Sequence, residues 1–290
     1  MLPTPIRVPD GAVIELSDEL RRSLPEENAF DYLLTIEGEE FRAVKNRRTV
    51  RFSAGPKYYF IKIHRGCGWG EILKNLIQFK SPVTGAEPER KGIVALTQIG
   101  VPTATLAGFG SRGRNPARRE SFVITESLDG MVSLAVLLEQ HWAALPHRQR
   151  LRLKRFFLQR CAEIARALHT HGMNHRDFYL YHFLVRERDW TAWDPSDETV
   201  VFLIDLHRMQ FRRRVHERWL VKDLGGLLFA ALDAGLTTRD LLRFARTYHA
   251  APLRALFAER SALWNRVVRN ACKLYSGFHR RPPTLPPALL

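Results

Sequence analysis

The first half of the chain combines strand-like stretches with two helical patterns. Over residues 41–64, β-branched and aromatic residues recur between turn signals, which predicts antiparallel strands. Residues 66–80 open with glycines and then space their apolar positions as an amphipathic helix does, and residues 87–99 carry a second helical pattern. Further strands are predicted at residues 104–109 and 121–126. This half is therefore strand-rich, with helices inserted.

Helical patterns dominate after residue 128. The longest covers residues 146–171 and is closed by Gly172, as many helices are closed by glycine. Residues 183–186 and 199–205 read as a pair of strands joined by a polar loop. The other predicted helices cover residues 131–140, 216–234, 238–249 and 261–275.

This order of elements predicts an α+β, bilobal fold with a strand-rich N-lobe and a helical C-lobe. We assign residues 1–40 to an N-terminal extension, 41–128 to the N-lobe and 129–281 to the C-lobe. The Pro-rich tail at residues 282–290 is expected to be disordered. Phosphotransferases of the protein-kinase type have this order of lobes, with ATP held between them.

Composition argues against a disordered chain and favours an anionic partner. Of the 290 residues, 45% are hydrophobic, which is enough to build a substantial core. The 45 Lys and Arg residues outnumber the 30 Asp and Glu residues, so the formal net charge is +15. Nucleic acid, an anionic membrane surface and a small acidic substrate all suit this charge. The densest basic stretches lie at residues 42–51, 148–155 and 208–214.

The three cysteines are too few and too widely spaced for a disulfide framework or a zinc site. No leader-like start and no apolar run long enough to span a membrane is evident in the sequence. We therefore expect a protein of the cytoplasm that can touch a membrane surface.

A catalytic-loop pattern follows the long predicted helix. His175, Arg176 and Asp177 resemble the protein-kinase motif H-R-D-x-x-x-x-N, in which the aspartate directs the acceptor hydroxyl. His182 stands where that motif has a metal-binding asparagine. Imidazole prefers softer metals than Mg²⁺, so His182 is predicted to bind either the metal or a phosphate. We expect His175 and Arg176 to support the loop.

Three further residues have the spacing of a nucleotide site. Asp205 ends an apolar strand one hairpin after the loop, as does the kinase aspartate that holds Mg²⁺ on the ATP phosphates. Lys62 lies in an alternating strand and resembles the lysine that contacts the α- and β-phosphates. Glu89 is our candidate for its ion-pair partner, with Glu87 as the alternative, because one sequence does not fix the register.

Three more residues complete the kinase pattern. Glu126 and Leu128 lie where the last strand of the first half leads into the helical half, and their backbone groups are expected to bind adenine as a hinge does. Asp223 lies in a later predicted helix and resembles the aspartate that supports the catalytic loop. No G-x-G-x-x-G motif precedes Lys62, so we expect the basic turn at residues 45–47 to contact phosphate instead.

Four longer stretches resemble the lipopolysaccharide core heptose(I) kinase family over residues 42–275. They read IKIHRGCGWGEILKNLI, HGMNHRDFYLYHFL, FLIDLHR and WLVKDLGGLLFAALDAGLT, and they include residues outside the general kinase set. The resemblance implies ATP as donor with Mg²⁺, and the first heptose of the lipid-linked inner core as acceptor. It also implies a Gram-negative bacterium and work at the cytoplasmic face of the inner membrane.

The same resemblance suggests an acyl carrier protein as a partner and peripheral contact with the anionic membrane, with no nucleic acid. Two alternatives stay open. One is a kinase of the same fold that acts on Kdo, another core sugar or protein tyrosine. The other is a non-catalytic binder of anionic membrane or nucleic acid on a pseudokinase scaffold.

Overall fold

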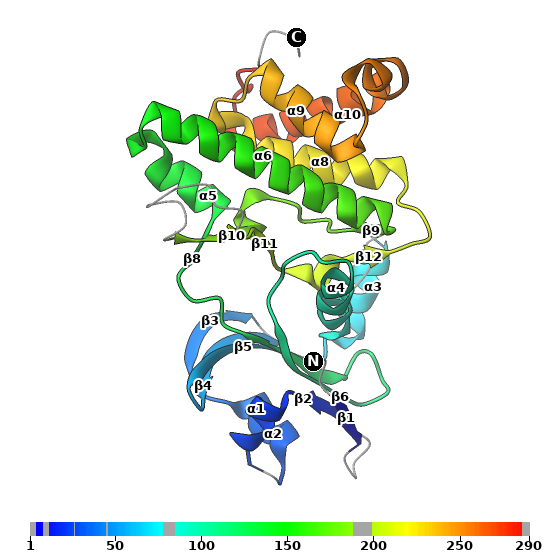
Figure 1. The fold of residues 1–290 in the computed structure, drawn as a ribbon. Helices are drawn as coiled ribbons and strands as arrows, with labels where there is room; N and C mark the ends of the chain where they lie inside the picture. Colours follow the sequence, from blue (N-terminus) through cyan, green and yellow to red (C-terminus); the bar gives the residue numbers. More distant parts are fainter. Residues whose placement is uncertain are drawn as a thin grey trace. The chain divides into compact units, whose positions relative to one another are not determined.

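An antiparallel sheet forms the first part of the computed structural model, which describes residues 4–7, 12–25, 27–44, 46–77, 85–187 and 199–285. Within these residues the sheet has seven strands in the order β1-β2-β6-β7-β5-β4-β3, and all neighbours are antiparallel (Figure 1). The strands are β1 (Thr4–Arg7), β2 (Val13–Leu16), β3 (Glu39–Val44), β4 (Arg47–Ala54), β5 (Lys57–Arg65), β6 (Leu106–Arg112) and β7 (Glu120–Glu126).

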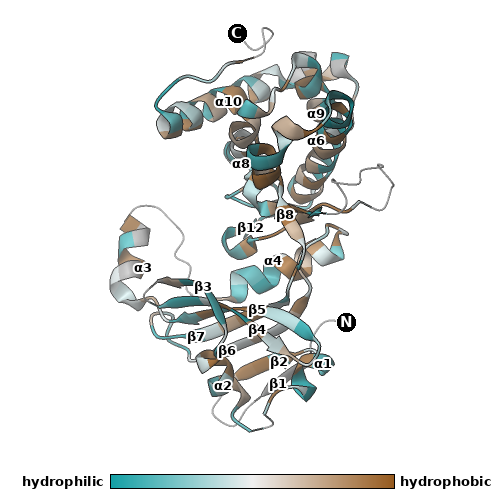
Figure 2. Ribbon diagram, turned by 90° about the vertical axis from the view of Figure 1, so that its left-hand side faces the viewer, coloured by the Kyte–Doolittle hydropathy of each residue, from teal (hydrophilic) through white to brown (hydrophobic). Residues whose placement is uncertain are grey.

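The two faces of this sheet have different partners. Helices α1 (Asp18–Arg22) and α2 (Ala29–Thr35) cover one face, where Leu20 and Leu33 pack with strand residues such as Ile61 in one buried core. Helix α4 (Glu87–Gln98) lies on the opposite side (Figure 2), and α3 (Gly68–Ile77) follows β5 directly. Because side chains alternate along a strand, residues next to the buried ones on β5 project toward the α4 side.

Helices α6 (His147–Thr170), α8 (Glu217–Ala231), α9 (Thr238–His249) and α10 (Leu253–His279) build the second part. Two short sheets accompany them. In one, β10 (Phe183–Arg186) pairs with β11 (Phe202–Leu203) and β8 (Met131–Ser133), and in the other β9 (Met173–Asn174) pairs with β12 (Gln210–Phe211). The α+β class predicted from the sequence is confirmed.

By its contacts the chain divides into a sheet unit and a helical unit. The sheet unit comprises Met1–Gln98, Thr103–Asp129 and Asp205–Arg208, and the helical unit comprises Ile99–Pro102, Gly130–Ile204 and Met209–Leu290. The segment at residues 12–40, which we assigned to an extension, supplies β2, α1 and α2 to the core of the sheet unit. The loop at residues 188–198 and the last five residues of the predicted tail lie outside the described residues.

The helix predicted at residues 131–140 begins at residue 134, where α5 (Leu134–Val136) continues into a π-helical turn at Leu137–His141. Residues 131–133 form β8, and Ser133 then caps α5 by accepting a hydrogen bond from the Val136 N–H. Pairing of β8 with β10 thus overrides the helical pattern at residues 131–133 only.

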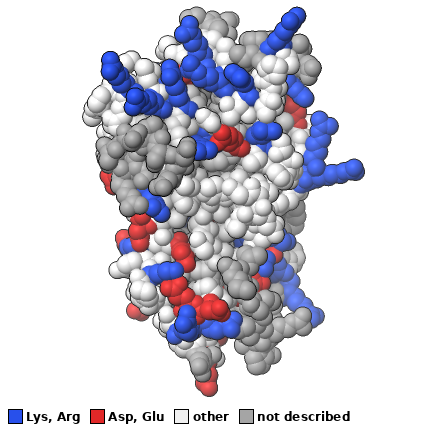
Figure 3. Space-filling model, in the orientation of Figure 1, with Lys and Arg blue, Asp and Glu red and all other residues white. Residues whose placement is uncertain are grey.

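The surface is strongly basic in places. On the face shown in Figure 3, Lys and Arg side chains are numerous over the helical unit and few Asp or Glu side chains accompany them. Within the described residues, no helix is long and apolar enough to cross a membrane.

Candidate active site

Lys62 projects from β5 into an ion-pair cluster on the α4 side of the sheet. Its neighbours Ile61 and Ile63 are buried in the core on the other face, so alternation along the strand directs Lys62 toward α4. The Lys62 Nζ lies 2.6 Å from Glu89 Oε1 and 3.1 Å from Asp205 Oδ1. All three residues belong to the sheet unit.

The glutamate that pairs with Lys62 is Glu89. Its side chain is 7% exposed and comes from the first turn of α4, whereas Glu87 lies near Arg90 and Lys91 at 3.7 and 3.5 Å. The other carboxylate oxygen of Glu89 is buried and makes no hydrogen bond to any described residue. Such a group is costly to leave without a partner, which is typical of a site that completes itself with a ligand.

Lys62 and Asp205 stabilise each other's charged form. Burial acts to lower the pKa of Lys62, but the carboxylates of Glu89 and Asp205 outweigh it and raise the pKa above its ordinary value. Burial likewise acts to raise the pKa of Asp205, but hydrogen bonds from His207 and Lys62 hold it well below its usual range. A lysine and an aspartate that stay charged across physiological pH suit contact with phosphate and with a hard cation.

His207 is a member of the cluster that the sequence pattern did not identify. It lies in the turn Leu206–Arg208, which packs against α4, and its Nδ1 is 2.8 Å from Asp205 Oδ1. In the kinase motif this position is a glycine, so the motif gave no reason to assign it a role. The signal available in the sequence is that His207 follows Asp205 by two residues, which lets the two side chains meet across a tight turn.

His64 lies near the same cluster on β5, and Arg47 of β4 is its cross-strand partner. His64 is buried, and burial together with the charges of Arg47, His207 and Lys62 lowers its pKa to about 4. It is therefore neutral at pH 7. Arg47 is the cross-strand partner of His64, and Lys45 of the same turn is outside the described residues, so phosphate contact by the turn at residues 45–47 stays a prediction.

Asp177 lies in the loop that follows β9, in the helical unit. Its backbone carbonyl accepts hydrogen bonds from the Tyr179 N–H at 3.0 Å and from His182 Nδ1 at 2.6 Å. Because a carbonyl can only accept, Nδ1 carries the proton, and a neutral His182 then has its lone pair on Nε2. His175 Nε2 binds the carbonyl of Ile204, the residue that precedes Asp205.

Asp223 fixes the backbone of this loop. Its two carboxylate oxygens accept from the N–H groups of His175 at 2.7 Å and Arg176 at 2.9 Å, and the side chain is fully buried. Arg176 has a φ of 75° and Asp205 a φ of 63°, both in the left-handed region that side chains rarely adopt. Strained backbone of this kind persists where the surrounding contacts enforce it, and it concentrates at functional sites.

Two residues that the sequence did not single out support Asp223. His169 Nε2 lies 3.4 Å from Asp223 Oδ2, and His169 Nδ1 lies 2.8 Å from the Tyr248 hydroxyl. Since the carboxylate only accepts, Nε2 donates, and in the neutral imidazole Nδ1 then accepts from the Tyr248 hydroxyl. Burial raises the pKa of Tyr248 and keeps that proton in place. Sequence reasoning missed them because α6 and α9 are far apart along the chain.

The predicted hinge residues belong to the sheet unit. The Glu126 N–H donates to the carbonyl of Thr105 and the Ser127 N–H donates to that of Tyr58. The Glu126 side chain lies 3.2 Å from Lys57 Nζ. These bonds fix the strand end that leads to Leu128.

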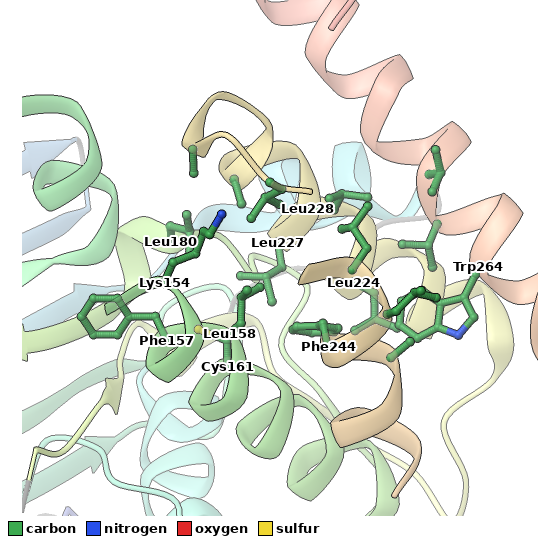
Figure 4. Close-up of a pocket in the computed structure, with 18 of the residues that line it drawn as sticks. Lys154, Phe157, Leu158, Cys161, Leu180, Leu224, Leu227, Leu228, Phe244 and Trp264 are labelled. Atoms are coloured by element: carbon green, nitrogen blue, oxygen red, sulfur yellow. The ribbon is translucent and has the colours of Figure 1, made fainter. Parts of the chain in front are cut away.

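The helical unit also contains an apolar cavity of about 340 Å³. Figure 4 shows Leu224 and Leu227 of α8 facing Leu158 of α6, with Phe244 and Trp264 completing the wall. Lys154 reaches the wall too, but its Nζ is bound to Asp240 at 2.7 Å. A cavity of this size is in the range of small-molecule sites and far larger than packing defects.

Comparison with known proteins agrees with this geometry. The model of the lipopolysaccharide kinase (Kdo/WaaP) family matches residues 31–248. The lipopolysaccharide core heptose(I) kinase WaaP of Pseudomonas aeruginosa is 41% identical over 91% of this chain and 97% of its own. The enzyme of the same name from Escherichia coli K12 is 40% identical over 87% of this chain and 93% of its own.

A solved structure described as WaaP in complex with acyl carrier protein superposes with a TM-score of 0.74. It is 35% identical and covers 90% of this chain and 99% of its own. The predicted protein-kinase-like fold is thus confirmed. The chain belongs to the lipopolysaccharide kinase (Kdo/WaaP) family, and it is a phosphotransferase that uses ATP.

Proposed function

We propose that this enzyme transfers the γ-phosphate of ATP to the first heptose of the lipopolysaccharide inner core. The observation that carries the proposal is the Lys62–Glu89–Asp205 cluster, because it joins a phosphate-binding lysine to an ionised, metal-type aspartate. The choice of acceptor follows the names of the two curated relatives.

Each residue has a separate role in this proposal. Lys62, held by Glu89, neutralises the α- and β-phosphates, and the backbone of Glu126 and Leu128 binds adenine. Asp177 accepts the proton of the sugar hydroxyl while the hydroxyl oxygen bonds to the γ-phosphorus. The bond from that phosphorus to the bridging oxygen then breaks, and ADP leaves. Asp223, His175 and Arg176 hold the loop that carries Asp177.

Asp205 is the residue we assign to Mg²⁺. Its carboxylate is the hard oxygen ligand that Mg²⁺ prefers, and its lowered pKa keeps it ionised. No group of three or more metal-binding side chains occurs within the described residues, which suits an ion that takes most of its ligands from phosphates and water. When bound, the ion neutralises charge on the transferred phosphate. His182 stays a second candidate ligand through Nε2.

An acyl carrier protein is the partner we propose in addition. Two observations support it. The solved relative carries one in its description, and the helical unit has an apolar cavity whose walls offer a dry surface to an acyl chain. The basic surface of the helical unit also suits an acidic protein and the anionic inner membrane. We propose that the enzyme binds this membrane peripherally.

The decisive experiment measures ATP-dependent phosphate incorporation into inner-core lipopolysaccharide that lacks the heptose phosphate. Wild type, Asp205→Ala and the surface control Asp31→Ala are compared, each checked for folding by thermal melting. We expect transfer by wild type and the control, and loss of at least about 100-fold in Asp205→Ala because a charge needed in the transition state is removed.

Retained turnover in Asp205→Ala would contradict the metal role. No transfer by wild type to this acceptor, with transfer to Kdo or to tyrosine peptides, would instead assign a different acceptor. Nucleotide binding without any turnover would favour the non-catalytic alternative.

A further inference from the structure

Four cationic side chains surround one indole ring in the helical unit. The charged groups of Arg176, Arg212, Arg218 and Lys222 lie 5.4, 5.2, 4.8 and 5.1 Å from the centre of the Trp219 ring. Attraction to the ring face offsets part of their mutual repulsion. Convergence of four positive charges on one point nevertheless needs an explanation.

Neutral groups, not carboxylates, hold the best-fixed of these cations. The Arg212 guanidinium donates to Asn174 Oδ1 at 2.7 Å and to Gln210 Oε1 at 2.8 Å. Its backbone N–H donates to the Gly172 carbonyl, and a side chain at residue 172 would collide with the Arg212 carbonyl, with 1.9 Å to the added carbon. Arg212 is thus built into place while its positive charge is not neutralised by these partners.

Three of the four cations have no carboxylate as an ion-pair partner among the described residues. These three are Arg212, Arg218 and Lys222. Asp223 is adjacent, but its two oxygens accept the backbone N–H groups of the catalytic loop. An anion bound at the indole would supply a counter-charge to Arg212, Arg218 and Lys222.

The cluster is tied to the catalytic loop. Trp219 and Asp223 are four residues apart on α8, so they share a face of that helix. Asp223 holds the backbone of Arg176, and the Arg176 side chain extends to Trp219. Arg176 directly precedes Asp177, so an anion held here lies beside the residue proposed to direct the sugar hydroxyl.

We propose that Arg176, Arg212, Arg218 and Lys222, organised around Trp219, form a subsite for a carboxylate or phosphate group of the sugar acceptor. This inference rests on the proposed function and deepens it, because it names what selects an anionic acceptor. The ATP phosphates have their own lysine in the sheet unit, and a single indole offers no series of stacking platforms for nucleic acid.

The test uses a deacylated, water-soluble inner-core acceptor, which removes the membrane as a source of anions. Arg218→Ala and Lys222→Ala are compared with Lys273→Ala. Lys273 is an exposed lysine of α10, so this control variant loses one positive charge as the other two do. We expect about a tenfold or larger rise in the acceptor KM for the first two, with kcat and the ATP KM within about twofold of wild type. Lys273→Ala should behave as wild type.

Modified acceptors identify the anion. If the subsite binds a carboxylate, reduction of the acceptor carboxylates to alcohols raises the wild-type KM and makes the variants equal to wild type. If the subsite binds a phosphate, removal of the acceptor phosphates has these two effects instead. An unchanged KM in both variants would overturn the subsite. So would an equal loss by the variants on both modified acceptors.

Equilibrium binding separates this inference from the proposed function. Affinity for the unreacted acceptor is measured by calorimetry without nucleotide, so the result does not need turnover. Weaker binding by Arg218→Ala and Lys222→Ala supports the subsite even if wild type transfers no phosphate. If instead the variants lose affinity only for phosphatidylglycerol vesicles, or only for acyl carrier protein, the cluster is a docking surface and the proposal is wrong.

Discussion

His64 shows how a single buried residue senses the charge around it. The imidazole lies beside Lys62 and Arg47, whose charges add to burial and lower its pKa from 6.5 to about 4. Because protonation is easier in the unfolded chain, stability is full above pH 6.5 and is lost as pH falls toward 4.

The pH dependence of unfolding tests this. Between pH 7 and pH 5 we expect His64 to contribute a loss of about 2 kcal/mol in the free energy of unfolding, measured by urea titration without nucleotide. His64→Asn should reduce the difference between the two pH values, whereas the exposed His147→Asn should leave it unchanged. An equal pH dependence in wild type and His64→Asn would refute the lowered pKa.

Most residues of the candidate site could be predicted from residue types and their spacing along the chain. Lys62, Asp177, Asp205 and Asp223 were identifiable because phosphoryl transfer needs a lysine and carboxylates in that order. The choice of Glu89 over Glu87 was not accessible, since it depends on how α4 is rotated against β5. His207 could not be predicted, because the kinase motif has a glycine at this position and so gives it no role.

At the scale of elements, the alternation along β5 and the long helix α6 were readable because burial dictates their periods. The helix predicted at residues 131–140 is confirmed from residue 134 onward. Its first three residues instead form β8, because they pair with a strand about fifty residues later. The relay from α9 through α6 to α8 was likewise beyond the sequence, since no local pattern links Tyr248, His169 and Asp223.

That relay makes Tyr248 a positioning residue. In Tyr248→Phe, His169 loses its hydroxyl donor, and we expect the free energy of unfolding to fall by about 1 kcal/mol. Because Asp223 is then less well held, kcat should also fall several-fold, about 3 to 10 times, with the ATP KM unchanged.

Tyr275→Phe is the matched control, since the Tyr275 hydroxyl donates to Asp233 at 2.7 Å in the same unit. It should lose comparable stability and keep its kcat. Equal kcat in both variants, measured on the inner-core acceptor, would reduce the relay to a purely structural role.

At the scale of the whole molecule, partners are the main question. Ala231 lines the apolar cavity, whereas the neighbouring Ala230 is not among its lining residues. If an acyl chain from the carrier protein fills this space, Ala231→Phe should reduce co-purified acyl carrier protein about tenfold, as quantified by mass spectrometry of the intact complex. Ala230→Phe should not, and thermal melting checks that both variants fold. Equal recovery of the carrier protein would exclude the cavity as its binding site.

The short segment Asp205–Arg208 belongs to the sheet unit, although the residues on both sides of it belong to the helical unit. A fragment ending at residue 129 therefore contains Lys62 and Glu89 but lacks the aspartate that completes their cluster. The two units are interleaved along the chain and are not exchangeable modules in series. A chimaera that takes its first 129 residues from another member of the family must take residues 205–208 from that member as well. Otherwise the lysine and glutamate of one protein would have to pair with the aspartate turn of another.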